Sequence, residues 1–387
     1  MINSPGDKPP FWRDDRFWRI ALQVLAVVAV VTIFAILGSN LNSNMQRSGV
    51  KFGFDFLQRN ASFAIGESVI PYDPATDSYL QVLLAGLVNT LRVAISGIIL
   101  TTFVGILAGI AQFSDNWLLN KISLVYVEIV RNTPLLLQLL FWYGLLIQLP
   151  SVENRINLFD SIFLSKRGIY LPWVSFPQAW GWFAVLFVGA IAAILLWRWR
   201  TKIMVEQGAS GKSQLIALSS MAVAAVLIIT IGLGWQVPQI GDNDTFVGGL
   251  RLSVEFSALL TGLVFYTGGF IAEIVRAGIQ SVSQGQWEAA NSLGLKSGLV
   301  MRLVIFPQAL RVMIPPLNSQ YQNLVKNSSL AIAVAYPDIY SVANTTFNQT
   351  GRVVEVILII MFTYLFFNLL ISSGMNLLNR TVQLRER

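Results

Sequence analysis

The sequence predicts an all-α membrane protein with about eight transmembrane helices. Hydrophobic side chains make up 54% of its 387 residues and charged side chains only 12%, whereas a soluble domain carries about 25% charged residues. Apolar runs long enough to cross a bilayer recur along the chain. Lys and Arg gather between alternate runs, as in the cytoplasmic loops of membrane proteins. This alternation places both termini in the cytoplasm.

The first apolar run covers 20–37 and follows Arg13, Arg16 and Arg19. It is too long for the core of a typical signal peptide, and no small-residue cleavage motif follows it. We therefore expect a retained helix with a cytoplasmic N-terminus. The polar residues 40–78 should lie outside.

Two long apolar runs follow, over 80–111 and 122–149. Both exceed the roughly 20 residues needed to cross a membrane, so tilt or protruding ends must absorb the surplus. Residues 151–178 have the composition of a loop and should lie outside. Trp173 within this segment suits a membrane interface.

A fourth and a fifth span are expected over 180–197 and 215–235. The loop between them is the most basic in the chain and should be cytoplasmic. It contains Arg198, Arg200, Lys202 and Lys212. Residues 236–251, which include Gly and Asp, should lie outside.

The last three spans are expected over 254–274, 316–335 and 353–378. The basic, amphipathic segment 276–311 should be cytoplasmic, and 337–352 should lie outside. Moving the count by one span would place the basic loop or the basic C-terminal tail outside, so the helix count and the orientation support each other. The tail contains Arg380, Arg385 and Arg387. We divide the chain into 1–79, 80–150, 151–253 and 254–387.

The chain contains no Cys and no His. Thiol chemistry, the commonest metal ligand and the usual general base near neutral pH are therefore missing. We expect no metal and no cofactor in this chain. The two absences weigh against a hydrolase or a redox enzyme, and carboxylate chemistry stays open. The net charge of +7 is explained by cytoplasmic loops, and no nucleic-acid motif is present. Residues 208–213 resemble the end of a phosphate-binding loop, but Glu206 stands where that pattern needs Gly and no strand precedes it.

A short helix is expected between the sixth and seventh spans, where 286–294 reads QWEAANSLG. Ser283 begins an S-x-x-Q capping-box spacing, and Glu288 lies in the first turns, where the helix dipole favours negative charge. Ala289 and Ala290 are small enough for another surface to approach closely. Gly294 can end the helix in the left-handed conformation. Two roles stay open: a surface gripped by a partner protein, or an amphipathic helix resting on lipid headgroups.

The tetrapeptide Glu-Ile-Val-Arg occurs twice, near the cytoplasmic ends of two spans. Glu128 and Arg131 have the i,i+3 spacing of a helical ion pair, and so do Glu273 and Arg276. They form either structural ion pairs or the two elements of an inner gate.

Several motifs occur in one order along the chain. Residues 127–138 read VEIVRNTPLLLQ, 268–279 read GGFIAEIVRAGI, and 315–330 contain PPLN and KNSSL. Together with the Glu288–Gly294 stretch and a later Pro307, they resemble the permease subunits of binding-protein-dependent ABC importers, specifically the polar amino-acid family. The resemblance covers 80–149 and 254–378. Residues 53–57, GFDFL, further resemble the general L-amino-acid subgroup.

The resemblance implies a five-helix ABC type I importer permease core, with the first helix and a two-helix insertion added to it. It also implies which residues dock on a separate ATPase subunit that binds ATP and Mg²⁺, namely Glu288, Ala289, Ala290 and Gly294. The chain itself would not be an enzyme. The implied partners are a second homologous permease, forming a heterodimer or a homodimer, two ATPase subunits and an external solute-binding protein, all at a bacterial inner membrane.

Polar groups deep in the spans are candidates for the substrate path. Lys326 lies about ten residues into the seventh expected span, or about 15 Å at 1.5 Å per residue, and Arg92 is similarly deep in the second. Deep cations usually face a cavity or a partner, so each either attracts the carboxylate of an amino acid or pairs with a partner subunit. Further hydrogen-bonding groups are Gln138, Asn327, Ser328 and Ser329.

The alternative function is an ion-coupled secondary amino-acid transporter. Such transporters usually carry carboxylates deep in their spans. Glu255 and Glu355 lie near outer ends, and Glu128 and Glu273 near inner ends. We therefore expect no carboxylate at mid-depth, which favours the importer.

Overall fold

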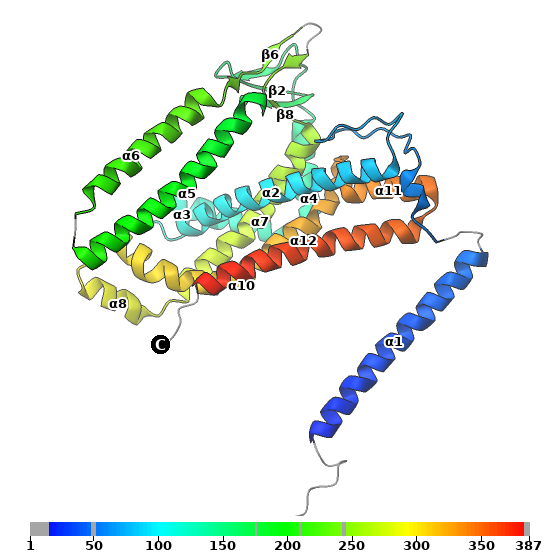
Figure 1. Ribbon diagram of the computed structural model, residues 1–387, viewed down its shortest axis with the longest axis horizontal. Coiled ribbons are helices and arrows are strands. Elements are labelled where there is room, and N and C mark those ends of the chain that lie inside the picture. The colour runs from blue at the N-terminus through cyan, green and yellow to red at the C-terminus, as the bar shows by residue number, and fades with distance from the viewer. Residues whose placement is uncertain (1–14, 48–51, 175, 209, 242–244, 383–387) are drawn as a thin grey trace, which may run out of the picture.

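The computed structural model describes residues 15–47, 52–174, 176–208, 210–241 and 245–382 (Figure 1). Seven helices in these ranges are long and apolar enough to cross a membrane, or up to eight if one bent pair is counted as a span. This confirms the predicted all-α membrane architecture with about eight helices. The basic residues Arg13, Arg385 and Arg387 lie outside the described residues.

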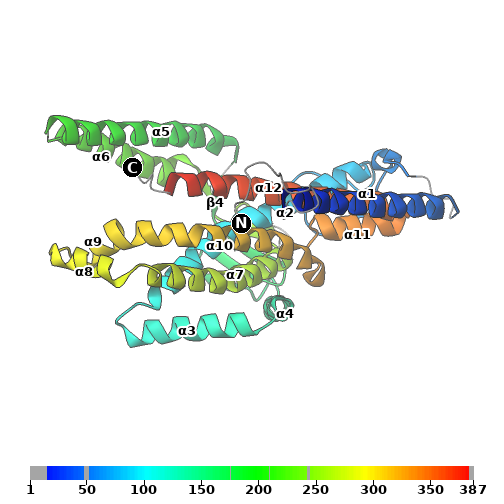
Figure 2. The same ribbon diagram turned by 90° about the horizontal axis from the view of Figure 1, so that it is seen from below.

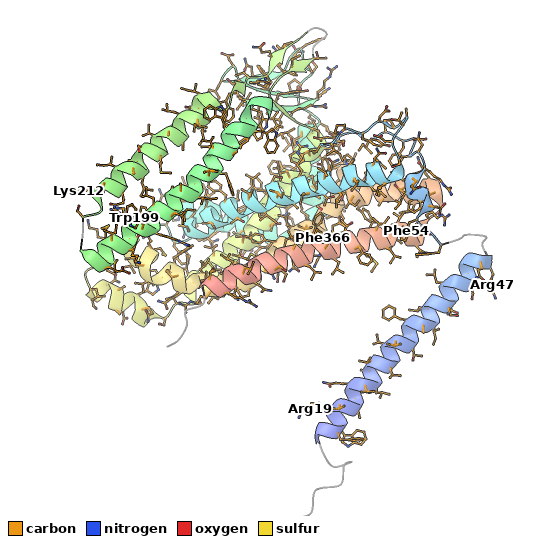
Figure 3. The ribbon with its side chains drawn as sticks, in the orientation of Figure 1. Arg19, Arg47, Phe54, Trp199, Lys212 and Phe366 are labelled. Carbon is orange, nitrogen blue, oxygen red and sulfur yellow. The ribbon has the colours of Figure 1, made fainter. Side chains whose placement is uncertain are left out.

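Helix α1 (Asp15–Arg47) stands clear of the other helices in Figure 1. None of its most apolar window is buried against the rest of the chain. Figure 3 shows Arg19 and Arg47 at its opposite ends. The helix runs past the expected end at 37, because 38–47 contains no proline to stop it.

The centre of the fold is the pair α2 (Tyr79–Ala111) and α7 (Val254–Gln280), which run in the same direction. Helix α2 begins with a capping box that Ser78 forms with the third helical residue. Near the other end, a Cβ built on Gly109 would lie 2.6 Å from Cβ of Val275 in α7. The missing side chain therefore lets the two backbones approach closely.

The third expected span is broken into α3 (Trp117–Asn132) and α4 (Leu135–Leu146), which meet at 111°. The prediction of one continuous helix was wrong. Pro134 lacks the N–H that would continue the helix, and it forces the preceding residue, Thr133, into an extended conformation at φ −116°.

The C-terminal part contains α10 (Phe306–Asn327), the 3₁₀ helix η6 (Ser328–Val334), α11 (Ile339–Thr350) and α12 (Val353–Val382). The seventh span therefore starts well before the predicted residue 316. Pro307 lies in the first turn of α10, directly after the π-helix η5 (Met301–Ile305), so its missing N–H falls where the π-helix changes to α-helix. Residues 337–352, predicted as an external loop, mostly form α11 instead.

Helix α11 packs along the first turns of α2. The Ile339 N–H donates to Oγ1 of Thr90 at 2.9 Å, and the Tyr79 hydroxyl donates to Oε1 of Gln349 at 3.0 Å. Asp338 caps α11 by accepting the Ser341 N–H at 2.8 Å, and it is fully buried. This buried carboxylate was not predicted, and it arises because α11 folds back along α2.

The insertion contributes a helical hairpin of α5 (Phe176–Gln207) and α6 (Lys212–Leu227), which continues as the π-helix η3 (Ile228–Gly232). These are the two predicted extra spans. Helix α5 continues through the residues predicted as a basic loop, so that only 208–211 join the helices. Figure 3 shows Trp199 and Lys212 at this joined end of the hairpin.

Short antiparallel strands gather at the other end of the hairpin, although 151–178 and 236–251 were predicted as loops. One sheet has the order β1-β2-β3-β8 and the other two sheets are the pairs β4-β5 and β6-β7. The strands are β1 (Ile156–Leu158), β2 (Ile162–Ser165), β3 (Gly168–Leu171), β4 (Trp173–Val174), β5 (Trp235–Gln236), β6 (Gln239–Ile240), β7 (Phe246–Val247) and β8 (Leu250–Leu252). Aromatic packing joins the sheets, since the Tyr170 and Phe246 rings stack at 3.9 Å.

The segment 52–78 covers the start of α2 and includes the 3₁₀ helix η2 (Asp55–Gln58). Phe56 is fully buried there, among residues of α2, α11 and α12. The Gly53 N–H donates to Oε1 of the buried Glu355 at 2.9 Å. This polar segment is therefore tied to the helices rather than free in solution.

The chain between α7 and α10 forms α8 (Gln284–Ser292), α9 (Ser297–Val300) and the π-helix η5 (Met301–Ile305). In Figure 1, α8 and the joined end of α5 and α6 lie at one end of the bundle, and the strands lie at the other. We call these the α8 end and the sheet end. Figure 2 shows the helices in layers, with α5 and α6 on one side, then α12, α10 and α7, and α3 on the opposite side.

Candidate functional site

One face of α8 is exposed at the α8 end of the bundle. Glu288 and Ala289 are exposed on it, and neither carboxylate oxygen of Glu288 has a hydrogen bond within the described residues. Leu293, directly after the helix, is 79% exposed. An apolar side chain this exposed beside a free carboxylate suits contact with another molecule. Leu293 was not predicted as a docking residue, although it lies within the 286–294 motif.

The opposite face of α8 is buried. Ala290 is 2% exposed and packs with Ile279, Val300 and Ile305, and Trp287 covers the same cluster. Of the four predicted docking residues, Ala290 therefore holds α8 against the bundle, whereas Glu288 and Ala289 face outward. This contact fixes the direction in which α8 presents its exposed face.

The N-terminal cap of α8 differs from the prediction, whereas its C-terminal glycine has the predicted conformation. The Ser283 side chain makes no capping hydrogen bond, so the predicted capping box is wrong. The Gln286 side chain instead accepts a hydrogen bond from Nε2 of Gln308 at 3.1 Å. Gly294 has φ +69°, as predicted for a left-handed helix end, and a Cβ there would meet nothing within 4 Å.

The two Glu-Ile-Val-Arg motifs form different contacts. Glu273 and Arg276 pair as predicted, with Nε to Oε2 at 3.0 Å. Glu128 and Arg131 do not pair in the described structure: Glu128 accepts a hydrogen bond from Nδ2 of Asn132 at 2.8 Å, and Arg131 approaches Glu273 at 3.9 Å. Arg131, Glu273 and Arg276 thus form one cluster that joins α3 to α7, because the helices lie side by side there.

Arg92 is not an unpaired cation of the substrate path. Its Nη1 pairs with Oε1 of Glu67 at 2.5 Å, and both side chains are about one-fifth exposed, at 21% and 19%. The guanidinium also lies 3.9 Å from the ring centroid of Phe256, a cation–π contact. Of the two roles open for this residue, the structure supports the ion pair, although the partner is in the same chain.

We expect Arg92→Met to lower stability by about 1–2 kcal/mol, because Glu67 would lose a charged hydrogen bond in a partly exposed site. The measurement is the thermal unfolding midpoint of the purified chain, compared with Lys166→Met on the exposed sheet surface. A normal midpoint combined with a raised KM for uptake would show that Arg92 contacts substrate instead.

Gln138 fills the break between α3 and α4. Its Nε2 donates to Oγ1 of Thr133 at 2.8 Å and to the Val130 carbonyl at 3.2 Å. The second bond satisfies a carbonyl near the end of α3 that the break leaves without an intrahelical partner. Gln138 also lines a mostly apolar cavity of about 370 Å³ with Trp142 and Phe265.

Lys326 and Ser329 line a groove of about 650 Å³ between the end of α10 and α12. Tyr340 lines it too, and the remaining lining residues are Leu358, Ile360, Met361, Phe362, Tyr364 and Leu365. Lys326 is the one charged group in this lining, and it has no ion pair within the described residues. Its depth must be revised, because α10 begins at Phe306 and Lys326 stands in its last turn.

The other predicted path residues are separated from this groove or bonded locally. Ser328 is fully buried and donates to the Val325 carbonyl at 2.8 Å. Asn327 is half-buried and does not line the groove. Arg92 and Gln138 lie elsewhere, so the structure brings together only Lys326 and Ser329 of the six residues.

Comparison with known proteins identifies relatives that are all named as amino-acid transport permeases. The family described as "Binding-protein-dependent transport system inner membrane component" matches residues 213–384. YhdX of Escherichia coli K12, named as an amino-acid ABC transporter permease protein, is 44% identical, covering 94% of each chain. The general L-amino acid transport system permease protein AapQ of Rhizobium johnstonii is 40% identical, covering 97% of this chain and 94% of its own. The glutamate/glutamine/aspartate/asparagine transport system permease protein BztB of Rhodobacter capsulatus is 39% identical, covering 97% and 96%.

Proposed function

Because this chain belongs to the permease subunits of amino-acid ABC importers, we propose that its exposed α8 face couples transport to ATP hydrolysis. The chain is a multi-pass inner-membrane protein and is not itself an enzyme, since the ATPase is a separate subunit. Importers of this family also work with a substrate-binding protein.

The exposed α8 face is the observation that carries the proposal. Glu288, Ala289 and Leu293 combine a free charge, a small side chain and an exposed apolar side chain on one surface. Such a combination can insert between the helices of a partner and be held there by charge. Ala290 anchors the opposite face to the bundle, so that a movement of α8 would be passed to α7 and α10. Gly294 ends the docking surface. The ATPase subunit would bind ATP and Mg²⁺.

We assign the α8 end to the cytoplasm and the sheet end to the outside, with both termini cytoplasmic. Lys212 and the connection between α5 and α6 lie at the same end of the bundle as α8, and basic residues favour the cytoplasmic side.

A topology test uses the absence of Cys from the chain. Val205 is 79% exposed near the α8 end of α5, and Lys166 is exposed on the sheet. An impermeant maleimide added to intact cells should label Lys166→Cys but not Val205→Cys. Val205→Cys should become labelled once the membrane is opened, and labelling of it from outside intact cells would contradict the orientation.

The groove around Lys326 is the proposed path, completed by a second homologous permease. An ammonium in an otherwise apolar, open groove needs an anion nearby. The carboxylate that all amino acids share can supply it during transport, and Tyr340 offers a hydroxyl group at the same wall. The second permease would close the open side, and the complex would contain two ATPase subunits and an external solute-binding protein.

The buried carboxylate of Asp338 does not support an ion-coupled secondary transporter. Asp338 accepts the N–H of Ser341 and a hydrogen bond from the Tyr364 hydroxyl at 3.4 Å. Both contacts give it a structural role at the start of α11.

The test of the function is purification of the tagged chain from native membranes, with identification of the bound subunits. An ATPase subunit should co-purify in the wild type and be lost in Ala289→Trp. The loss of no subunit, or the absence of any ATPase, would count against coupling through α8.

A further inference from the structure

A polar cavity lies at the sheet end of the bundle and shares no lining residue with the groove around Lys326. Its volume is about 600 Å³, within the range of small-molecule sites, about 300–1,000 Å³. Three stretches meet there: the segment before α2, the junction of β8 and α7, and the turn between η6 and α11. Its lining consists of Gly66, Glu67, Ser68, Arg251, Ser253, Glu255, Ala335 and Pro337.

One of the charges in this cavity is already neutralised. Glu67 accepts from Arg92 with one carboxylate oxygen and from the Ser253 hydroxyl with the other. Ser253 in turn caps α7 by accepting the Phe256 N–H at 3.0 Å. Glu67 is therefore committed to holding the wall together and is not available to a ligand.

The two remaining charges are opposite in sign and do not pair. Arg251 uses Nε to donate to the Arg167 carbonyl at 3.0 Å, which leaves its terminal nitrogens free of any ion pair within the described residues. Glu255, in the first turn of α7, forms no hydrogen bond or ion pair there either. Both side chains line one cavity, yet no contact within 4.0 Å joins them.

We propose that this cavity is an outer binding site for the zwitterion of a free α-amino acid. Arg251 binds the carboxylate and Glu255 binds the ammonium. A ligand that carries an ammonium and a carboxylate on one carbon fits a wall whose own opposite charges are held apart. The site reads only the groups that all α-amino acids share and leaves the rest of the cavity for the side chain.

The inference rests on the proposed function for its substrate and orientation. The cavity would receive an amino acid released by the external binding protein before it reaches the groove around Lys326. The turn that forms part of the cavity, at Ala335 and Pro337, directly follows η6, which carries Ser329.

The test is protection of a single engineered cysteine inside the cavity. Gly66 lines the cavity, and a Cβ built there meets nothing within 4 Å, so Gly66→Cys should fold. The permease complex carrying this change is treated with an impermeant maleimide in the presence of increasing L-alanine. L-alanine should slow the labelling, and L-alaninamide and N-acetyl-L-alanine, which each lack one charge, should require about 10-fold higher concentration.

Two further variants assign the charges. Arg251→Gln in the Gly66→Cys background should raise the half-protecting concentration of L-alanine about 10-fold and abolish its advantage over L-alaninamide. Glu255→Gln should do the same relative to N-acetyl-L-alanine. Lys166→Gln and Glu153→Gln change exposed charges outside the cavity and should leave protection unchanged.

Unchanged labelling with L-alanine, or equal protection by all three compounds, would overturn the proposal. So would identical protection in wild type, Arg251→Gln and Glu255→Gln. The assay does not require ATP hydrolysis, and subunits bound to the same sample are identified separately. Absence of an ATPase would thus refute the coupling function without altering the result for the cavity.

Discussion

Ala289→Trp should reduce amino-acid uptake by at least about 100-fold while the permease still inserts into the membrane. Ala289 is exposed on the α8 face that also carries Glu288 and is followed by Leu293. An indole added at the centre of a close-packed contact would hold the two surfaces apart, and disruption of such a central contact costs about 2–4 kcal/mol. The bundle itself should be unaffected, because α8 is anchored by Ala290 on its other face.

The matched control is Asp115→Trp. Asp115 is exposed in the connection between α2 and α3 and forms no hydrogen bond or ion pair within the described residues. Uptake should stay near the wild-type level in this variant. Glu288→Lys should also impair uptake, by reversing the charge of the same face. Gly294→Trp is less informative, since φ is +69° there and any side chain strains the backbone.

The measurements are uptake by the assembled complex and ATP hydrolysis stimulated by substrate. Ala289→Trp should lower both, while its unfolding midpoint stays the same. Normal stimulated ATP hydrolysis in Ala289→Trp would show that the partner grips another surface. Equal losses in Ala289→Trp and Asp115→Trp would show a general effect of added bulk at this end.

Gly109→Leu should prevent stable folding of the permease. A Cβ at this position would lie 2.8 Å from the carbonyl oxygen of Ala272 as well as 2.6 Å from Cβ of Val275. Backbone cannot move aside as a flexible side chain can, so α2 and α7 would have to separate. Since these two helices form the centre of the fold, we expect a loss of more than about 4 kcal/mol.

Gly189→Leu is the matched control, because a Cβ added to Gly189 in α5 would meet nothing within 4 Å. Its folded yield and unfolding midpoint should match the wild type. Gly109→Ala should already lower the midpoint, since the Cβ itself makes the close contact. A stable, fully folded Gly109→Leu protein would refute the close packing of α2 on α7.

The break between α3 and α4 shows where hydropathy alone fails. The apolar stretches on both sides of 128–134 make 122–149 long enough to cross a membrane, so a continuous span was expected. The local signal was Thr133-Pro134, because proline restricts its predecessor and removes a donor. The angle of 111° depends on how α4 packs against α7, which no local signal contains.

Lys326 and Arg92, the two cations predicted for the substrate path, show which features depend on residues far away in the sequence. Their depth was counted from expected helix starts, and α10 begins earlier than Pro316 suggested. Arg92 pairs with Glu67, which belongs to the polar segment 40–78 that was predicted to lie outside the membrane. The sequence does not show which cation pairs with which anion when the two residues are far apart along the chain.

The sequence by itself determined the class of fold, the number of spans to within one and the position of α8. Each of these depends on the transfer free energy or conformational preference of consecutive residues, which can be summed along the chain. The resemblance in the motifs added the family, which the comparisons then supported. Tertiary structure decided which face of α8 is buried, that α11 folds back along α2 around Asp338, and that Arg251 and Glu255 line one cavity. These features arise from contacts between distant segments, whose geometry depends on the packing of the whole bundle.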